Sequence, residues 1–184
     1  MDGMEQAKRP VTALAGRYGH PLHPALVAVP IGAWIASLVF DVASHLVRDP
    51  GFLTQGSRWL IGLGVVGALA AAMVGFLDLF AIPTGTRAFR LALVHMSINL
   101  TVTAAYVIGF LVRGGHRSGP VAWGALVLSA VALAGLAVSG YLGGELAYRY
   151  GVRVADEATQ AHGYQATSTT RTTTARNTAR EERI

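Results

Sequence analysis

Four long apolar runs, separated by short polar stretches, constrain the fold of this chain more than any other feature. About 20 apolar residues of α-helix cross a bilayer core of about 30 Å, and each run is long enough to do so. The runs do not alternate apolar with polar residues, so strands are a poor alternative. We therefore predict four transmembrane helices, at about 25–46, 59–80, 91–112 and 121–148.

The composition and the loops extend this prediction to a whole fold. Only 14% of the residues are charged, against about 25% in soluble domains. The connections between the runs are short and carry turn residues such as Asp49-Pro50-Gly51, so consecutive helices must run antiparallel. We predict an all-α, integral membrane, up-down-up-down four-helix bundle over residues 20–155. Residues 1–19 form an N-terminal segment, and the Thr/Arg-rich stretch 156–184 is predicted to be a disordered tail.

Basic residues near the helix ends predict the orientation. The side that carries both termini has seven Lys and Arg residues and the other side has four. By the positive-inside rule we predict that both termini are cytoplasmic and that the helices lie in the plasma (inner) membrane. The net charge of +5 is therefore explained by basic residues that flank the membrane spans. No motif of a nucleic-acid-binding fold is present.

Five ionisable residues from four parts of the chain are predicted to meet near the cytoplasmic face. Helix positions at about 1.5 Å per residue place them at one membrane level. They are His20, His23, Asp78, His95 and Glu145. Imidazole and carboxylate groups suit zinc, manganese or non-haem iron, so one hypothesis is a divalent transition-metal site. The alternative is that the histidines cap the first helix or contact headgroups, while the carboxylates pair with Arg87, Arg90 or Arg149.

A single haem b is the rival cofactor. It requires two histidines that face each other across an apolar gap, which His23 and His95 could provide. His23 and His45 are 22 residues apart, about 33 Å along a helix, and cannot share one haem. Two stacked haems are therefore disfavoured. The absence of cysteine excludes thiolate ligands and iron–sulfur clusters from this chain.

Further polar residues lie within the apolar runs. Asp41 and His45 are four apart on one helical face, so the carboxylate could orient the imidazole. This pair is either a proton-accepting pair or an interfacial hydrogen bond. Asn99 lies four residues after His95 and is expected to bond a neighbouring helix. Arg149 is a candidate partner for the cluster's carboxylates.

Several of these segments together resemble a known family. The opening Gly19-His20-Pro21-Leu22-His23-Pro24, then Gly75-Phe76-Leu77-Asp78, His95 with Asn99, and Gly143-Gly144-Glu145-Leu146 are similar to a bacterial membrane-protein family called domain of unknown function 2231. The resemblance covers roughly residues 17–155 and implies a four-helix membrane domain of unassigned activity. Relatives carry histidine where Glu145 stands here. Some resemble fusions to a Rieske-type domain, which implies electron-transfer surroundings.

Three functional hypotheses remain open at this point. The first is a redox-associated or metal-binding bundle with a redox partner. The second is a cofactor-free accessory subunit of a larger complex, and the third is a small proton or ion transporter. Glycine ridges such as Gly64-Ala68-Ala72 predict close helix contacts within the bundle or in a homo-oligomer. The signatures of hydrolases, phosphate-binding loops and dinucleotide folds are absent, which disfavours an enzyme.

Overall fold

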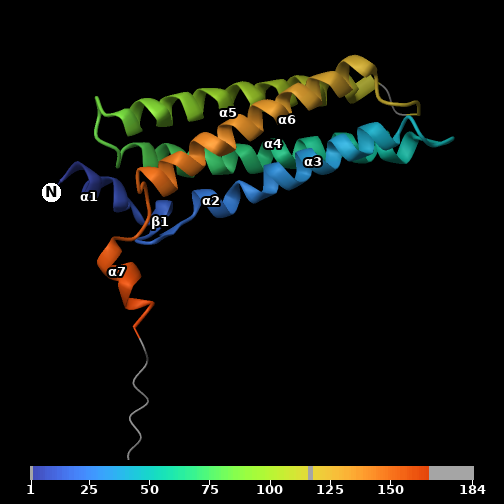
Figure 1. The fold of residues 1–184 in the computed structure, drawn as a ribbon. Coiled ribbons are helices and arrows are strands. Elements are labelled where there is room, and N and C mark those ends of the chain that lie inside the picture. Colours follow the sequence, from blue (N-terminus) through green and yellow to red (C-terminus); the bar gives the residue numbers. More distant parts are fainter. Residues whose placement is uncertain (1, 116–117, 166–184) are drawn as a thin grey trace, which may run out of the picture.

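The computed structural model describes residues 2–115 and 118–165 and confirms the predicted all-α four-helix bundle (Figure 1). Four of its helical segments are long and apolar enough to cross a membrane, with mean hydropathies between 1.7 and 2.4. The long helices are α3 (Ala28–Ala43), preceded by the single turn α2 (His23–Leu26), then α4 (Gly51–Leu79), α5 (Arg87–Val112) and α6 (Trp123–Gly144).

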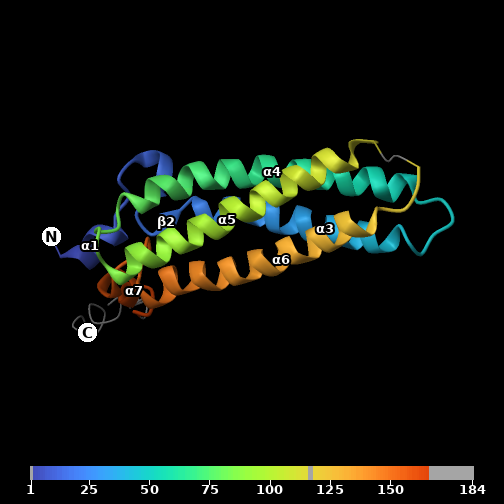
Figure 2. The same ribbon diagram turned by 90° about the horizontal axis from the view of Figure 1, so that it is seen from above.

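The long helices run up and down between two ends of the bundle (Figure 2). One end, called here the terminal end, carries α1 (Gly3–Lys8), α7 (Glu157–His162) and the α4–α5 turn. The other, the loop end, carries the α3–α4 and α5–α6 connections, including the 3₁₀ turn Arg113–Gly115. Most of the predicted disordered tail lies outside the described residues, and its described part contains α7.

Two helix boundaries differ from the prediction for identifiable reasons. The second long helix begins at Gly51 and not near residue 59, because Thr54 and Ser57 turn inward and are buried although their polarity suggested a loop. The first span is broken at Val27, between α2 and α3. Pro30 has no N–H to bond the carbonyl of the residue four positions earlier, and α2 ends at that residue.

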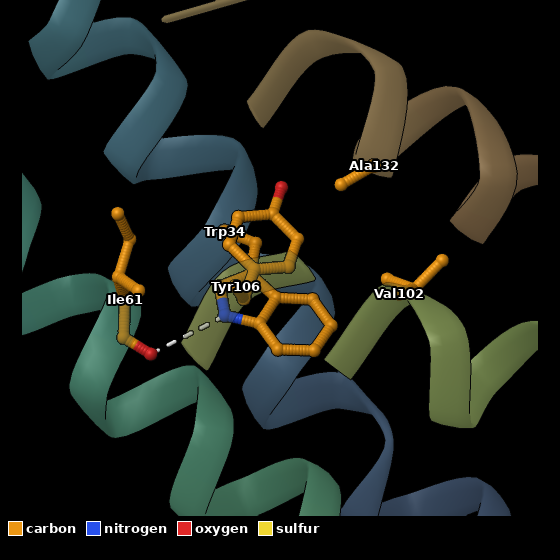
Figure 3. Packing of buried hydrophobic residues seen from close by; sticks show 5 residues of the cluster. All are labelled: Trp34, Ile61, Val102, Tyr106 and Ala132. Carbon is orange, nitrogen blue, oxygen red and sulfur yellow. Dashed lines mark hydrogen bonds between the residues drawn. The ribbon is translucent and has the colours of Figure 1, made fainter. Parts of the chain in front are cut away.

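The centre of the bundle is a stacked aromatic pair. The rings of Trp34 and Tyr106 lie 4.0 Å apart and nearly parallel, and both side chains are 1% exposed (Figure 3). The indole N–H of Trp34 donates to the carbonyl of Ile61 at 3.3 Å. Gly64 lets the indole approach α4, because a Cβ at that position would lie 2.2 Å from Trp34 Nε1.

The outer faces of the helices are apolar, as contact with lipid requires. On α4 the side chains of Leu63, Val66 and Met73 are more than half exposed. Glycines, alanines and serines fill much of the interior, where they allow the helices to approach. The chain is therefore a membrane-spanning bundle in contact with the bilayer.

The terminal end is covered by the N-terminal segment and the chain that follows α6. The segment contains the 3₁₀ turn Ala13–Ala15 and two short paired strands, β1 (Gly16–Arg17) and β2 (His20–Pro21). After α6 the helix continues as a π-helical turn, Glu145–Arg149. We call residues 2–22 together with 150–156 the cap.

The packing of Trp34 on Gly64 gives a stability prediction. Gly64→Ala raises helix propensity by about 1 kcal/mol, but its methyl group would collide with a buried ring. We expect the overpacking to win and to lower the free energy of unfolding by about 1–3 kcal/mol. Unfolding in detergent measures the change. Gly140→Ala is the control, because its Cβ would meet no atom within 4 Å. Equal stability of the two variants would contradict this packing.

Candidate functional site

His23 is fixed at the start of the first span by its hydrogen bond and by a glycine. It occupies the first turn of α2, before Pro24. Its Nδ1 lies 2.8 Å from the carbonyl oxygen of Ala71 in α4. A carbonyl only accepts, so Nδ1 carries the proton and Nε2 is the basic nitrogen of the neutral ring. Gly75 makes room for the imidazole, since a Cβ there would lie 2.8 Å from Nδ1.

His95 is held in the same manner between α5 and α6. Its Nδ1 lies 2.8 Å from the carbonyl oxygen of Ser139, and the ring lies against Gly143, whose Cβ would be 3.1 Å from Cε1. Asn99 contacts this histidine, with Nδ2 at 2.9 Å from the His95 carbonyl and 3.2 Å from Nε2. The same Nδ2 lies 2.6 Å from Ser139 Oγ. The expected bond from Asn99 to a neighbouring helix is therefore formed.

The two imidazoles meet between the helices near the terminal end. Their ring centroids are 6.3 Å apart and their planes are almost perpendicular, at 85°. Both rings are half-buried. Because each Nδ1 is committed to a main-chain carbonyl, the Nε2 atoms are the two nitrogens with lone pairs. His23 and His95 are the two members of the predicted cluster that pack against each other.

Asp78 is near this pair but has another partner. Its Oδ1 forms a buried ion pair with Arg153 Nε at 2.7 Å, whereas the sequence suggested Arg87, Arg90 or Arg149. The pair lacks hydrogen-bond geometry, so within the described part of the chain both atoms are buried without a hydrogen bond. Arg153 Nη2 donates to the carbonyl of Ala15 at 2.7 Å. The pair therefore fastens the cap to α4.

The remaining two members of the predicted cluster point elsewhere. His20 is exposed in β2, with Nδ1 at 3.4 Å from the carbonyl of Tyr18 in the cap. Glu145 pairs with Arg149 at 2.8 Å, as the alternative interpretation expected, and Arg149 is 70% exposed. Among the described residues no group of three or more His, Asp or Glu side chains is arranged to share a metal ion. The predicted five-residue metal cluster is therefore not assembled.

The loop end contains a second polar cluster, centred on a buried ion pair. Asp41 and Arg113 are 0% and 4% exposed, and Arg113 Nη2 lies 2.5 Å from Asp41 Oδ2. Ser57 donates to the other carboxylate oxygen. Arg113 also donates to the carbonyl of Gly109 and to Ser129 Oγ, both at 3.0 Å. Such added hydrogen bonds offset the cost of removing two charges from water.

His45 takes no part in that cluster, contrary to the predicted Asp41–His45 pair. Its ring stacks on Trp123 at 4.4 Å, and its Nε2 is buried without a hydrogen-bond partner in the described part of the chain. The reason is competition, since both oxygens of Asp41 are taken by Arg113 and Ser57. The hydrogen bond between Asp41 and His45 that a proton-accepting pair requires is therefore not formed.

Two arginines that the sequence pattern did not single out organise these clusters. Arg113 and Arg153 follow apolar runs and were counted as flanking charges of the topology, yet both are buried. The available signal was the unpaired carboxylate in each run. A buried Asp41 or Asp78 requires a cation, and an arginine at a helix end is long enough to reach back into the bundle.

The buried ion pair gives a prediction about paired variants. Asp41→Ala leaves the charge of Arg113 buried and uncompensated, which should cost about 3–5 kcal/mol of unfolding free energy. The double variant Asp41→Leu with Arg113→Met should lose much less unfolding free energy than the sum of the losses in Asp41→Leu alone and Arg113→Met alone. Apolar replacement of a whole buried pair is often neutral. Unfolding in detergent measures both. Additive losses would argue against this coupling, and the exposed Arg149→Ala variant should change little.

The cap contains a clasp with a defined pH dependence. Tyr18 donates to Asp156 at 2.6 Å, and this hydrogen bond, together with those from Thr159, lowers the pKa of Asp156 from 3.8 to about 2. Because the folded pKa lies below the unfolded one, the clasp contributes stability above about pH 4 and loses it as the pH falls through about 2. Tyr18 also accepts from the backbone N–H of Asp156 at 2.7 Å, and this bond does not titrate. We therefore expect Tyr18→Phe to lower the thermal midpoint more at pH 5 than at pH 2. Tyr164→Phe, at an exposed tyrosine, should have no effect at either pH, and a pH-independent loss in Tyr18→Phe would contradict the linkage.

Comparison with known proteins gives a family but no activity. No curated protein and no solved structure matches the chain. A family model described as "Predicted membrane protein (DUF2231)" matches residues 19–156, which include every long helix and the residues of both polar clusters. The match covers well over half of the sequence. This chain therefore belongs to the DUF2231 family of membrane proteins.

Proposed function

We propose that this membrane protein binds a transition metal between His23 and His95 and has a redox-associated role. One observation carries the proposal. Two imidazoles from different helices lie with their ring centroids 6.3 Å apart, and each has its Nδ1 on a main-chain carbonyl at 2.8 Å. Histidines that bind metals almost always donate their other ring N–H to such an acceptor, which fixes the tautomer and the ring orientation.

The distance between the rings suits one shared metal. Imidazole nitrogens bind first-row metals at about 2.0 Å, which places the centroids of two opposed ligands roughly 6 Å apart. The centroids of His23 and His95 are 6.3 Å apart. Imidazole ligands favour iron, copper, zinc or nickel over magnesium and calcium. The electron-transfer surroundings that the family resemblance implies favour iron or copper, which exchange electrons.

The predicted topology places the proposed site on one side of the membrane. The excess of Lys and Arg at the terminal end supports cytoplasmic termini in a bacterial inner membrane. The histidine pair would then lie near the cytoplasmic face, beneath the cap. A redox partner would approach from that side. Residues 1–19 and the predicted tail, 156–184, would then also lie in the cytoplasm.

The packing disfavours transport through a single chain. The stacked rings of Trp34 and Tyr106 lie between the histidine pair and the Asp41–Arg113 pair, and both are buried. A proton or ion path along the axis would have to cross these rings. A cofactor-free accessory subunit remains the main rival, since the histidines could serve only helix packing.

Metal content per chain tests the proposal. Protein purified in mild detergent without a His-tag should hold about one iron or copper ion per chain, measured by elemental mass spectrometry. Loss of a ligand typically weakens metal binding by at least about 10–100-fold, so His23→Ala and His95→Ala should each lose the metal. His20→Ala and His45→Ala are matched controls, because these imidazoles lie outside the pair.

Two results would overturn the proposal. One is metal-free protein from cells supplied with iron and copper, which would favour the accessory subunit. The other is full metal content in the double variant His23→Ala, His95→Ala. Thermal unfolding of each variant shows that the bundle is intact. His23→Gln and His95→Gln keep the side-chain size and separate lost ligation from lost packing.

A further inference from the structure

Three pairs of side chains meet along the middle of the bundle, and all three have the same spacing in the sequence. The bundle consists of two helix hairpins, the first formed by α2, α3 and α4 and the second by α5 and α6. Each pair joins the first span to α5, or to the residue that follows it, across the interface of the two hairpins. The second member always lies 72 positions after the first. The pairs are His23 with His95, Trp34 with Tyr106, and Asp41 with Arg113.

The second helices of the two hairpins, α4 and α6, correspond in the same way, with equivalent residues 68 positions apart. His23 bonds the carbonyl of Ala71 and His95 bonds that of Ser139. The next pair behaves in the same way, since Trp34 donates to the carbonyl of Ile61 at 3.3 Å and Tyr106 to that of Ser129 at 3.3 Å. The glycines beneath the imidazoles, Gly75 and Gly143, also lie 68 positions apart.

Burial follows the same two spacings. Five buried positions of the first hairpin's second helix each have a buried counterpart 68 positions later. These pairs are Ser57 with Ala125, Ile61 with Ser129, Gly64 with Ala132, Ala71 with Ser139, and Asp78 with Leu146. The two hairpins therefore share one packing scheme, and the α3–α4 connection is four residues longer in sequence than its counterpart.

This correspondence defines an approximate twofold axis along the bundle. When two copies of a unit pack about a twofold axis, a residue on the axis meets its own equivalent. The helices α3 and α5 start from the same end, so the repeats are parallel and the axis runs along the membrane normal, as in other duplicated membrane folds. His23 and His95 are therefore equivalent residues on the axis.

We propose that the chain is a duplicated helix hairpin whose axial site takes a single haem, with His23 and His95 as equivalent ligands on the two faces of the iron. This inference rests on the proposed function and names its ligand class. The axis supplies two imidazoles with nearly perpendicular planes and ring centroids 6.3 Å apart, and the described residues add no third metal-binding side chain. A haem iron needs only two protein ligands, because the tetrapyrrole supplies the other four nitrogens.

The surroundings of each imidazole act as positioning groups for this ligand. The carbonyls of Ala71 and Ser139 hold the Nδ1 protons and leave both Nε2 lone pairs for the iron. Asn99 lies 3.2 Å from His95 Nε2 and would have to release it. That contact is the longest of its three, and the bonds to the His95 carbonyl and to Ser139 Oγ would remain.

Titration with hemin tests the ligand class. Purified protein in detergent, loaded with hemin or isolated from cells supplied with it, should bind one haem per chain with the visible spectrum of six-coordinate, low-spin iron. His23→Gly and His95→Gly should each lose that spectrum, and added imidazole should restore it in both. Equal rescue of the two variants is the specific consequence of equivalent ligands. His20→Gly is the control and should keep the wild-type spectrum.

The glycines provide a second readout that leaves both ligands in place. Gly75→Ala and Gly143→Ala each push a methyl group against one imidazole, so both should shift the reduction potential of the bound haem. Gly140→Ala, in the same helix as Gly143 and open to space, should not. Unchanged potentials in both variants would contradict the assigned positions.

The outcomes separate this inference from the proposed function. Metal bound without a tetrapyrrole, and lost in the histidine variants, would sink the haem assignment and leave the metal site standing. Protein that binds neither metal nor hemin would sink both. Haem binding that depends on only one of the two histidines would refute the axial site, while the metal proposal would need a new ligand.

Discussion

The buried ion pair between Asp41 and Arg113 is the interaction on which the packing of the two hairpins depends. Neither charge could remain inside an apolar bundle alone. Together they bond groups on the other helices, since Ser57 in α4 donates to the carboxylate while Ser129 and the carbonyl of Ala125 in α6 accept from the guanidinium. Among the described residues, Arg113 Nε alone of the guanidinium nitrogens has no hydrogen bond. The pair thus fixes the relative height of α3 and α5. With that height set, the Trp34–Tyr106 stack and the His23–His95 pair fall into contact at their own levels.

The same pair also breaks the symmetry that the duplication would otherwise leave. Two copies of the first hairpin, packed as these repeats pack, would bury two Asp41 carboxylates against each other. Two copies of the second would bury two Arg113 side chains. Like charges in such a setting are costly, whereas the mixed arrangement is an ion pair. The aromatic and histidine levels carry no such preference, because their members are chemically alike. Opposite charges at one level therefore favour the packing of the first hairpin against the second.

The apolar runs were enough to predict the fold, because lipid demands long internally bonded helices. The convergence of His23 and His95 followed from depth alone. The sequence did not reveal the duplication, since between 23–41 and 95–113 only His23/His95 and Ala33/Ala105 are identical. A repeat of this kind is conserved in packing and hydrogen bonding, which residue identity does not record. Depth also could not say which way a side chain points, so His20 and Glu145 were grouped with residues from which they turn away, and Asp41 was given to His45.

Access to the histidine pair depends on the two structures that enclose it. Toward the loop end the Trp34–Tyr106 rings lie on the axis, so the proposed ligand and redox partner have access from the terminal end or from between the hairpins. The cap covers the terminal end and is held by Arg153, whose backbone is left-handed, with φ of 62°. That conformation costs roughly 1–3 kcal/mol for a residue other than glycine. The ion pair to Asp78 and the bond to Ala15 offset this cost, so the cap is closed by side-chain contacts that act against its own backbone.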